Sequence, residues 1–192
     1  MPAAPSRRAA RRRLRAADWG AIRLFAMDVD GVLTDGTVLV SSDGTEAKAF
    51  SILDGYGLRE LARAGIVTAW ISGRPSAATS RRAAELEIPH LVMGRNDKLA
   101  VLRDLARDLA LEPAHCAYMG DDVIDVPALA WAGIGIAPPD AVGAALAAAA
   151  WVTRRRGGHG AVRDVCDRLL ERSPTRTGTQ TRSHRSKERP SA

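Results

Sequence analysis

Short apolar runs alternate along this chain with segments whose apolar residues recur at helical spacing. The apolar runs predict strands at residues 22–29, 66–72, 90–94, 115–120, 134–137 and 151–153. The helical spacing predicts helices at residues 55–64, 75–86, 97–109, 122–132, 140–148 and 161–170. Because such alternation builds a parallel sheet covered by helices on both faces, the sequence predicts an α/β fold with a Rossmann-like, doubly wound parallel sheet.

One segment interrupts the alternation directly after the first predicted strand. Residues 37–40 and 45–50 flank the turn Ser42-Asp43-Gly44, which is typical of a β-hairpin rather than a crossover helix. We therefore expect a β-hairpin insertion and no large cap domain. In open α/β sheets, ligands bind at the carboxyl ends of the strands, so the residues that end each strand are the candidates for chemistry.

The positive charge of the chain is concentrated at its two ends. The sequence has 28 basic and 22 acidic residues, a formal net charge of +6. Residues 1–17 contain six arginines and no acid, and residues 171–192 contain six basic and two acidic residues, which leaves 16 basic and 20 acidic residues between them. Both ends lack apolar periodicity and are rich in polar residues and proline, as disordered segments are. We expect disordered basic tails at 1–17 and 171–192 around one globular domain at 18–170.

Composition argues against several classes of protein. The tails contain no aromatic residue, so base stacking has no support and specific nucleic-acid binding is not expected. The longest apolar stretch, residues 144–152, is far shorter than the ~20 residues of a membrane span. Cys116 and Cys166 have no metal-ligand spacing and form no disulfide framework. The default expectation is a reduced, cytoplasmic protein outside any membrane.

The first two predicted strands end in residues that suit phosphate chemistry. Asp28 and Asp30 lie two apart on an extended strand, so their carboxylates point the same way, although Asp-Gly is also a common turn signal. Ser72 ends the second strand, where its hydroxyl and the neighbouring loop amides, such as that of Gly73, suit a phosphate oxygen. A helix cap is the alternative for this serine.

The next two strands lead to a lysine and to further acids. Lys98 opens a helix and, taken alone, is interpreted as a surface charge, while Asp121, Asp122 and Asp125 stand where acids also favour a helix amino terminus. Taken together, the four strand ends bring carboxylates, a hydroxyl and an ammonium to one crevice. The carboxylates would repel one another unless a cation lay among them. Oxygen ligands without His or Cys point to Mg²⁺.

These residues resemble the four motifs of the haloacid dehalogenase superfamily, namely Asp28-x-Asp30-Gly31, Ser72, Lys98 and Gly120-Asp121-Asp122-x-x-Asp125. Within that superfamily the chain resembles the capless 3-deoxy-D-manno-octulosonate 8-phosphate phosphatases. The segments that carry this resemblance are Glu46-x-Lys48-x-Phe50, Asp54-Gly55-x-Gly57, Ile71-Ser72-Gly73-Arg74-x-Ser76 and Gly157-Gly158-x-Gly160-Ala161-Val162-Arg163-x-x-Cys166. The match runs from about residue 23 to residue 170.

The resemblance implies a phosphomonoester hydrolase that forms an aspartyl-phosphate. Asp28 would be the nucleophile, and Asp30 would protonate the leaving oxygen and then deprotonate water. Mg²⁺ would be held by the Asp28 carboxylate, the Asp30 main-chain carbonyl and the Asp121 carboxylate. Asp122 and Asp125 would lie next to these ligands, without binding the ion directly, and hold them in position.

Other residues would bind the substrate. The resemblance implies that Ser72, the Gly73 turn and Lys98 contact phosphate oxygens and that Lys98 offsets the charge of Asp28. Arg74 would pair with the carboxylate of a sugar acid, with a local salt bridge as its other possible role.

The resemblance also implies a homotetramer whose hairpins form a central barrel and so close an open site. The alternation of Val38 and Val40 fits one face buried against partners. Residues 156–160 would form a mobile lid that reaches a neighbouring active site, or else a flexible entry to the last helix.

The predicted reaction is Mg²⁺-dependent hydrolysis of 3-deoxy-D-manno-octulosonate 8-phosphate, a step in lipopolysaccharide precursor synthesis. Two alternatives stay open at this point. One is a phosphatase acting on a nine-carbon sialic-type acid 9-phosphate, and the other is a catalytically silent binding subunit.

Overall fold

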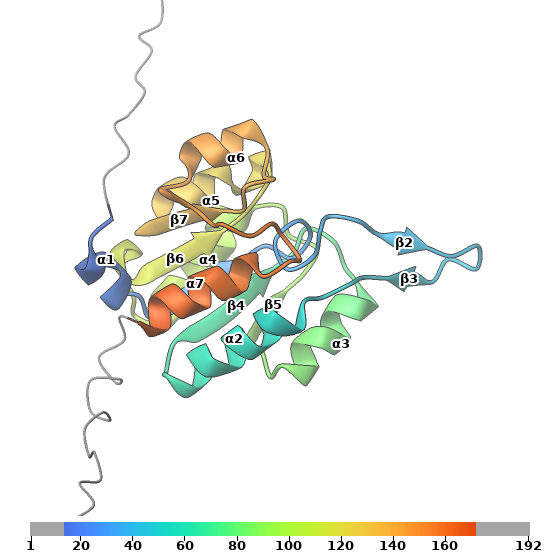
Figure 1. The fold of residues 1–192 in the computed structure, drawn as a ribbon, viewed down its shortest axis with the longest axis horizontal. Helices are drawn as coiled ribbons and strands as arrows, with labels where there is room; N and C mark the ends of the chain where they lie inside the picture. Colours follow the sequence, from blue (N-terminus) through green and yellow to red (C-terminus); the bar gives the residue numbers. More distant parts are fainter. Residues whose placement is uncertain (1–13, 172–192) are drawn as a thin grey trace, which may run out of the picture.

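The computed structural model describes residues 14–171, in which a six-stranded sheet lies between two layers of helices (Figure 1). The strands of this sheet are β1 (Leu24–Met27), β4 (Val67–Ile71), β5 (His90–Val92), β6 (Cys116–Met119), β7 (Ile134–Ala137) and β8 (Trp151–Val152). Their order is β5-β4-β1-β6-β7-β8, and all neighbours are parallel. The predicted doubly wound α/β sheet is confirmed, and no large cap interrupts the described residues.

Helices cover both faces of the sheet. They are α1 (Ala16–Gly20), α2 (Ile52–Arg63), α3 (Ala77–Glu85), α4 (Lys98–Asp108), α5 (Val126–Trp131), α6 (Gly143–Ala148) and α7 (Ala161–Leu170), with short 3-10 turns η1 (Pro113–His115) and η2 (Val123–Asp125). Phe25 and Met27 of β1 belong to the core under α1, α2 and α7, whereas Leu24 and Ala26 belong to the core under α4, α5 and α6. Burial on both faces explains why the strands appear in the sequence as continuous apolar runs.

The predicted hairpin follows β1 as an arm made of β2 (Leu39–Val40) and β3 (Glu46–Ala47). Figure 1 shows this arm reaching out beyond the helical layers. The two strands pair antiparallel over only two residues each, so they are shorter than predicted. Leu39 and Val40 are 65% and 69% exposed. The arm therefore presents apolar side chains that nothing else in residues 14–171 covers.

Helix α2 begins at Ile52, earlier than the predicted residue 55. Ser51 caps it, because the serine hydroxyl accepts hydrogen bonds from the N–H groups of Leu53 and Asp54, at 3.2 and 3.5 Å. This cap satisfies amide groups that have no partner within the helix. Only residues 48–51 separate β3 from this helix.

The ends of the described chain lie close to the predicted domain edges. Helix α1 begins at Ala16, two residues before the predicted edge, and its Trp19 meets Trp151 edge to face with ring centroids 5.1 Å apart. The remaining parts of the predicted tails, 1–13 and 172–192, lie outside the described residues, so their disorder stays a prediction. None of the helices between residues 14 and 171 has the length and apolarity that crossing a bilayer requires.

A buried carboxylate joins α2 to the start of α7. Asp54 is 1% exposed, and its Oδ1 accepts a hydrogen bond from the Arg163 N–H at 2.7 Å. Burial raises the pKa of Asp54 to about 6, and hydrogen bonds from the backbone at Arg163 and Gly160 oppose this only in part. Asp54 thus serves as a partner for an amide in the first turn of α7.

Asp54→Asn should remove a pH dependence of stability. The folded pKa lies above the ordinary value of 3.8, so ionisation opposes folding, and this carboxyl lowers the free energy of unfolding as pH rises from about 4 to about 6. Asparagine keeps the oxygen acceptor without the charge. The stability of the variant relative to the wild type should therefore rise by about 2–3 kcal/mol between pH 4 and pH 7.5. Urea unfolding at both pH values measures this difference, and a pH-independent difference would contradict the assignment.

Candidate active site

The predicted strand ends meet in one cleft at the carboxyl edge of the sheet. Asp28 directly follows β1, and Asp121 follows the neighbouring strand β6 after a single glycine. The cleft has a volume of about 210 Å³ and is lined by Asp28, Asp30, Gly73, Arg74, Asn96, Asp121, Asp122 and Ile124. It lies where the strand order reverses around β1, which is the expected ligand position in a doubly wound sheet.

An ion pair between Asp28 and Lys98 lies at the base of this cleft. The Lys98 Nζ is 2.8 Å from Asp28 Oδ1 and also donates to the carbonyl of Ile71. The side chain of Lys98 is 0% exposed and that of Asp28 is 8% exposed. The interpretation of Lys98 as a surface charge therefore does not hold. Lys98 is the first residue of α4, where the helix dipole disfavours a cation. Contact with Asp28, rather than helix propensity, accounts for this lysine.

Three carboxylates converge beside the ion pair. One ligand oxygen from each of Asp28, Asp121 and Asp125 lies within 4.8 Å of the other two. Burial, opposed by Lys98, raises the pKa of Asp28 to about 6. Burial, reinforced by the neighbouring carboxylates Asp28 and Asp125, raises the pKa of Asp121 to about 8. A bound divalent cation would relieve this repulsion.

The hydrogen bonds of the cluster distinguish an available ligand from a supporting one. Asp121 Oδ1 is buried and has no hydrogen-bond partner within residues 14–171. Both oxygens of Asp125 are engaged, since the Tyr118 hydroxyl donates to Oδ1 at 2.6 Å and the N–H groups of Asp121 and Asp122 donate to Oδ2 at 3.0 Å. A buried oxygen without a partner fits Mg²⁺. Asp28 and Asp121 therefore suit the role of ligands, and Asp125 holds the Asp121 loop in place.

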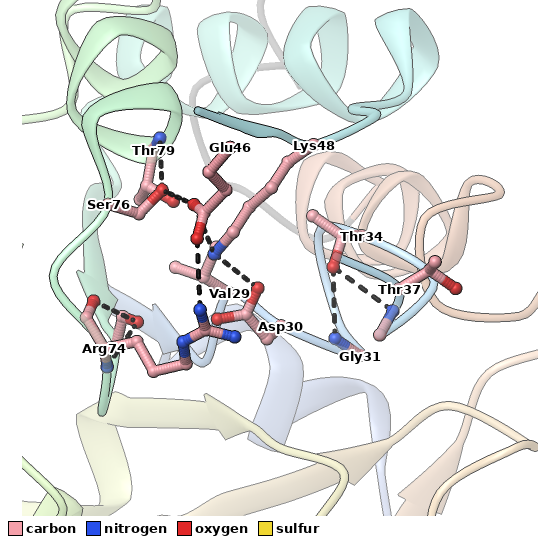
Figure 2. Close-up of polar contacts among 12 residues, drawn as sticks. Val29, Asp30, Gly31, Thr34, Thr37, Glu46, Lys48, Arg74, Ser76 and Thr79 are labelled. Carbon is pink, nitrogen blue, oxygen red and sulfur yellow. Dashed lines mark hydrogen bonds and ion pairs between the residues drawn. The ribbon is translucent and has the colours of Figure 1, made fainter. Parts of the chain in front are cut away.

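A glycine allows the loop after β1 to pass close to Asp121. Gly31 has a φ of +86°, and a Cβ at this position would collide with the Asp121 carboxylate. The Thr34 hydroxyl accepts hydrogen bonds from the N–H groups of Gly31 and Gly36, at 3.3 and 3.2 Å (Figure 2). Thr34 is fully buried. It shapes the loop that carries Asp30, a role that was not predicted from the sequence.

The turn after β4 contains the predicted phosphate-binding residues. Ser72 is fully buried, and its hydroxyl donates to the Arg74 carbonyl at 3.0 Å and accepts from the Arg74 N–H at 3.1 Å. The cap of α3 is Ser76, so the alternative of Ser72 as a helix cap is wrong. Gly73 and Arg74 line the cleft, and a side chain on Gly73 would collide with Asn96. Contact between Ser72 and phosphate stays a prediction.

A polar network from the hairpin reaches the cleft (Figure 2). The Lys48 Nζ is 2.6 Å from Asp30 Oδ1 and 3.8 Å from Glu46 Oε1. Glu46 also pairs with Arg74 at 3.1 Å and accepts a hydrogen bond from the Ser76 hydroxyl at 2.5 Å. The local salt bridge considered for Arg74 is thus present. In the sequence, Glu46 and Lys48 appeared only as members of a family pattern, without a role.

Two further residues that line the cleft, Asn96 and Ile124, were not predicted from the sequence. Asn96 lies between β5 and α4, so scrutiny of the end of β5 would have found it. Ile124 lies on η2 beside Val123, and the two are 41% and 61% exposed. Exposed apolar residues at a cleft have no signature in the sequence.

The segment predicted to be a lid packs on its own chain. The Gly158 N–H donates to the Val32 carbonyl at 3.0 Å, and the Gly157 N–H donates to Asp140 Oδ1 at 3.2 Å. A Cβ on Gly157 would collide with the carbonyl oxygen of Gly31. These glycines therefore permit a close approach to the loop after β1. Contact with a neighbouring active site stays a prediction.

Comparison with known proteins finds related sequences over most of the chain. A family model for haloacid dehalogenase-like hydrolases matches residues 90–163. The 3-deoxy-D-manno-octulosonate 8-phosphate phosphatases of Escherichia coli (strain K12) and Yersinia pestis are each 45% identical to this chain over 149 residues. These matches cover 78% of this chain and 79% and 80% of the two relatives.

Solved structures agree with the sequence relatives. The 3-deoxy-D-manno-octulosonate 8-phosphate phosphatase from Moraxella catarrhalis, in complex with a magnesium ion, a phosphate ion and a KDO molecule, is 46% identical with a TM-score of 0.81. That match covers 82% of this chain and 91% of the other. The cobalt-bound deoxy-D-mannose-octulosonate 8-phosphate phosphatase from Haemophilus influenzae is 35% identical, with a TM-score of 0.78 over 81% of this chain and 91% of its own.

Asp121→Asn should stabilise the metal-free protein and abolish its response to Mg²⁺. Because the pKa of Asp121 is about 8, its charge opposes folding at pH 8.5, and a neutral amide should raise the midpoint of thermal unfolding in EDTA by about 2–4 °C for each kcal/mol relieved. Mg²⁺ should raise the midpoint of the wild type by binding the folded state. Thermal unfolding of both proteins with and without Mg²⁺ tests this. A variant that keeps the full Mg²⁺ shift would show that Asp121 is not a ligand.

Proposed function

This chain belongs to the haloacid dehalogenase-like hydrolases, in the family of the 3-deoxy-D-manno-octulosonate 8-phosphate phosphatases, and from that membership we propose that it hydrolyses 3-deoxy-D-manno-octulosonate 8-phosphate to 3-deoxy-D-manno-octulosonate and phosphate. The observation that carries the proposal is the buried Asp28–Lys98 pair beside Asp121 at the strand ends. A nucleophile, a phosphate-binding cation and a metal ligand are the groups that this reaction needs. The reaction would serve lipopolysaccharide precursor synthesis.

The first half-reaction transfers the phosphoryl group to the protein. A carboxylate oxygen of Asp28 attacks phosphorus, the bond between phosphorus and the sugar oxygen breaks, and Asp30 gives its proton to that oxygen. Lys98 holds the Asp28 carboxylate at 2.8 Å and attracts the phosphate oxygens with its ammonium. The products are the free sugar acid and an aspartyl-phosphate.

The second half-reaction regenerates Asp28. The Asp30 carboxylate removes a proton from a water molecule as the water oxygen attacks phosphorus. The bond between phosphorus and the Asp28 oxygen breaks, and inorganic phosphate leaves. Asp30 regains its proton in this step and is ready for the next substrate.

Mg²⁺ is the cofactor in this proposal. The carboxylates of Asp28 and Asp121 and the main-chain carbonyl of Asp30 hold it, with Asp122 and Asp125 behind them. When bound, it supplies positive charge that offsets the charge of the phosphoryl group. The free, buried Asp121 Oδ1 supports this assignment.

The substrate is recognised at two places. The Ser72-Gly73 turn binds phosphate oxygens, and Arg74, at the cleft wall, pairs with the carboxylate of the sugar acid. Arg74 is 54% exposed at its side chain and pairs with Glu46, so a substrate carboxylate can approach its guanidinium from the open side.

The proposed assembly is a homotetramer joined through the hairpin arms. Leu39, Val40, Ile52 and Tyr56 support it, because these apolar side chains of the arm and of α2 are 55–79% exposed in the single chain. We assign the protein to the cytoplasm. Its cysteines, Cys116 and Cys166, are both free and buried, as is usual in a reducing compartment.

Phosphate release from 3-deoxy-D-manno-octulosonate 8-phosphate with Mg²⁺ tests the proposed reaction. Asp28→Asn, or EDTA, should lower kcat at least about 1000-fold, the scale on which loss of a nucleophile acts. Asp104→Asn makes the same chemical change on the exposed face of α4 and should leave kcat unaltered. A higher kcat/KM on a nine-carbon sialic-type acid 9-phosphate would show that this compound, rather than the octulosonate phosphate, is the preferred substrate. Inactivity on both phosphates would contradict it and favour a silent subunit.

Replacing the apolar tip of the arm tests the assembly. Leu39→Asp combined with Val40→Asp places charges where the proposed contacts bury apolar side chains, so the variant should have a lower molar mass than the tetrameric wild type in light scattering. Circular dichroism should stay unchanged, because both residues are exposed in the single chain. A wild type that is already monomeric would contradict the tetramer.

A further inference from the structure

The side chain of Lys48 is buried although the backbone around it lies at the surface. Its neighbours Ala47 and Ala49 are exposed, whereas the Lys48 side chain is 0% exposed. Side chains alternate along an extended segment, so Lys48 turns inward where Ala47 and Ala49 turn outward. Figure 2 shows it extending from the arm to Asp30, beyond the end of β1.

The ammonium of Lys48 is fixed from two sides. It is 2.6 Å from Asp30 Oδ1 and 3.8 Å from Glu46 Oε1. Glu46 is itself held by Arg74 and Ser76, at 3.1 and 2.5 Å. Burying an ammonium costs several kcal/mol unless it is paired, and an apolar side chain would anchor the hairpin without that cost. The pair with Asp30 offsets this cost, and hairpin anchoring alone does not explain the choice of a lysine here.

We propose that Lys48 is a positioning residue for proton transfer, and this inference rests on the proposed phosphatase reaction. Asp30 is 25% exposed at its side chain, so without a partner its carboxyl group can turn to water. Lys48 holds one carboxyl oxygen, which keeps the group directed at the oxygen that leaves phosphorus. The hairpin thereby contributes to the chemistry of the sheet, in addition to any role in assembly.

Substrates with different leaving groups distinguish a role in proton transfer from a purely structural role of Lys48. When the bond from phosphorus to a sugar oxygen breaks, the leaving alkoxide takes the proton of Asp30, whereas p-nitrophenolate is stable without a proton. Hydrolysis of the aspartyl-phosphate is the same for both substrates, but kcat/KM reports only the half-reaction in which the leaving group departs. Loss of proton transfer to that group should therefore lower kcat/KM for the sugar phosphate and spare it for p-nitrophenyl phosphate. A lysine that only anchored the hairpin would affect both substrates alike.

Lys48→Met removes the ammonium and keeps much of the volume. With Mg²⁺, we expect kcat/KM to fall about 100-fold on 3-deoxy-D-manno-octulosonate 8-phosphate, within the range that general acid catalysis contributes, and less than about 3-fold on p-nitrophenyl phosphate. Arg59→Met is the matched control, because Arg59 is a half-exposed cation on α2 that pairs with Glu87. It should alter neither rate.

A double-mutant cycle shows whether Lys48 acts through Asp30. In an Asp30→Asn background, single-turnover rates on the sugar phosphate should fall by less than about 3-fold on adding Lys48→Met, because the acid is already absent. Equal losses on the two substrates, or an undiminished loss in the Asp30→Asn background, would overturn the inference. If Lys48→Met does not fold, Lys48→Gln is compared in the same way. A wild type inert on both phosphates would instead contradict the proposed function.

Discussion

Negative charge buried at the ends of β1 and β6 is the constraint on which the rest of the site depends. Asp28, Asp121 and Asp125 approach within 4.8 Å of one another, and such a cluster is tolerated only if positive groups and hydrogen-bond donors surround it. Lys98 comes from the start of α4, the Tyr118 hydroxyl from β6, and the amides of Asp121 and Asp122 from the loop after β6. The doubly wound sheet brings these donors together at its carboxyl edge. The same arrangement of strands therefore determines both the fold and the chemical groups of the site.

The sheet and the hairpin contribute different things. In the proposed reaction the sheet ends supply the groups that form and break bonds. The cleft there is open on one side, because no large domain covers it within residues 14–171. The arm carries the exposed apolar side chains of Leu39 and Val40, and its charged residues Glu46 and Lys48 reach the cleft. If both proposals hold, an element only a few residues long takes part in assembly and in chemistry. Such a double use of one hairpin suits a small phosphatase that has no cap domain.

Much of this architecture could be predicted, because periodicity and strand ends are local features. The six strands, the hairpin and the convergence of Asp28, Lys98 and Asp121 followed from the sequence. The pairs between Lys48 and Asp30, and between Arg74 and Glu46, did not, since they join residues 18 and 28 positions apart and depend on how the arm folds back over the sheet. Asp54 was visible only as part of a pattern, because its partner amide at Arg163 lies 109 positions away.

Gly157 and Gly158, before α7, make the loop after β1 depend on a segment that is synthesised late. Gly157 lies against Gly31, and Gly158 donates to Val32, so the loop that carries Asp30 is supported from near the far end of the chain. A growing polypeptide that has left the ribosome only as far as β7 already contains every acid of the cleft, yet it lacks this support. Contacts that span so much of the chain form late and slow folding. The cleft should consequently reach its final shape only after residues 157–158 have been synthesised.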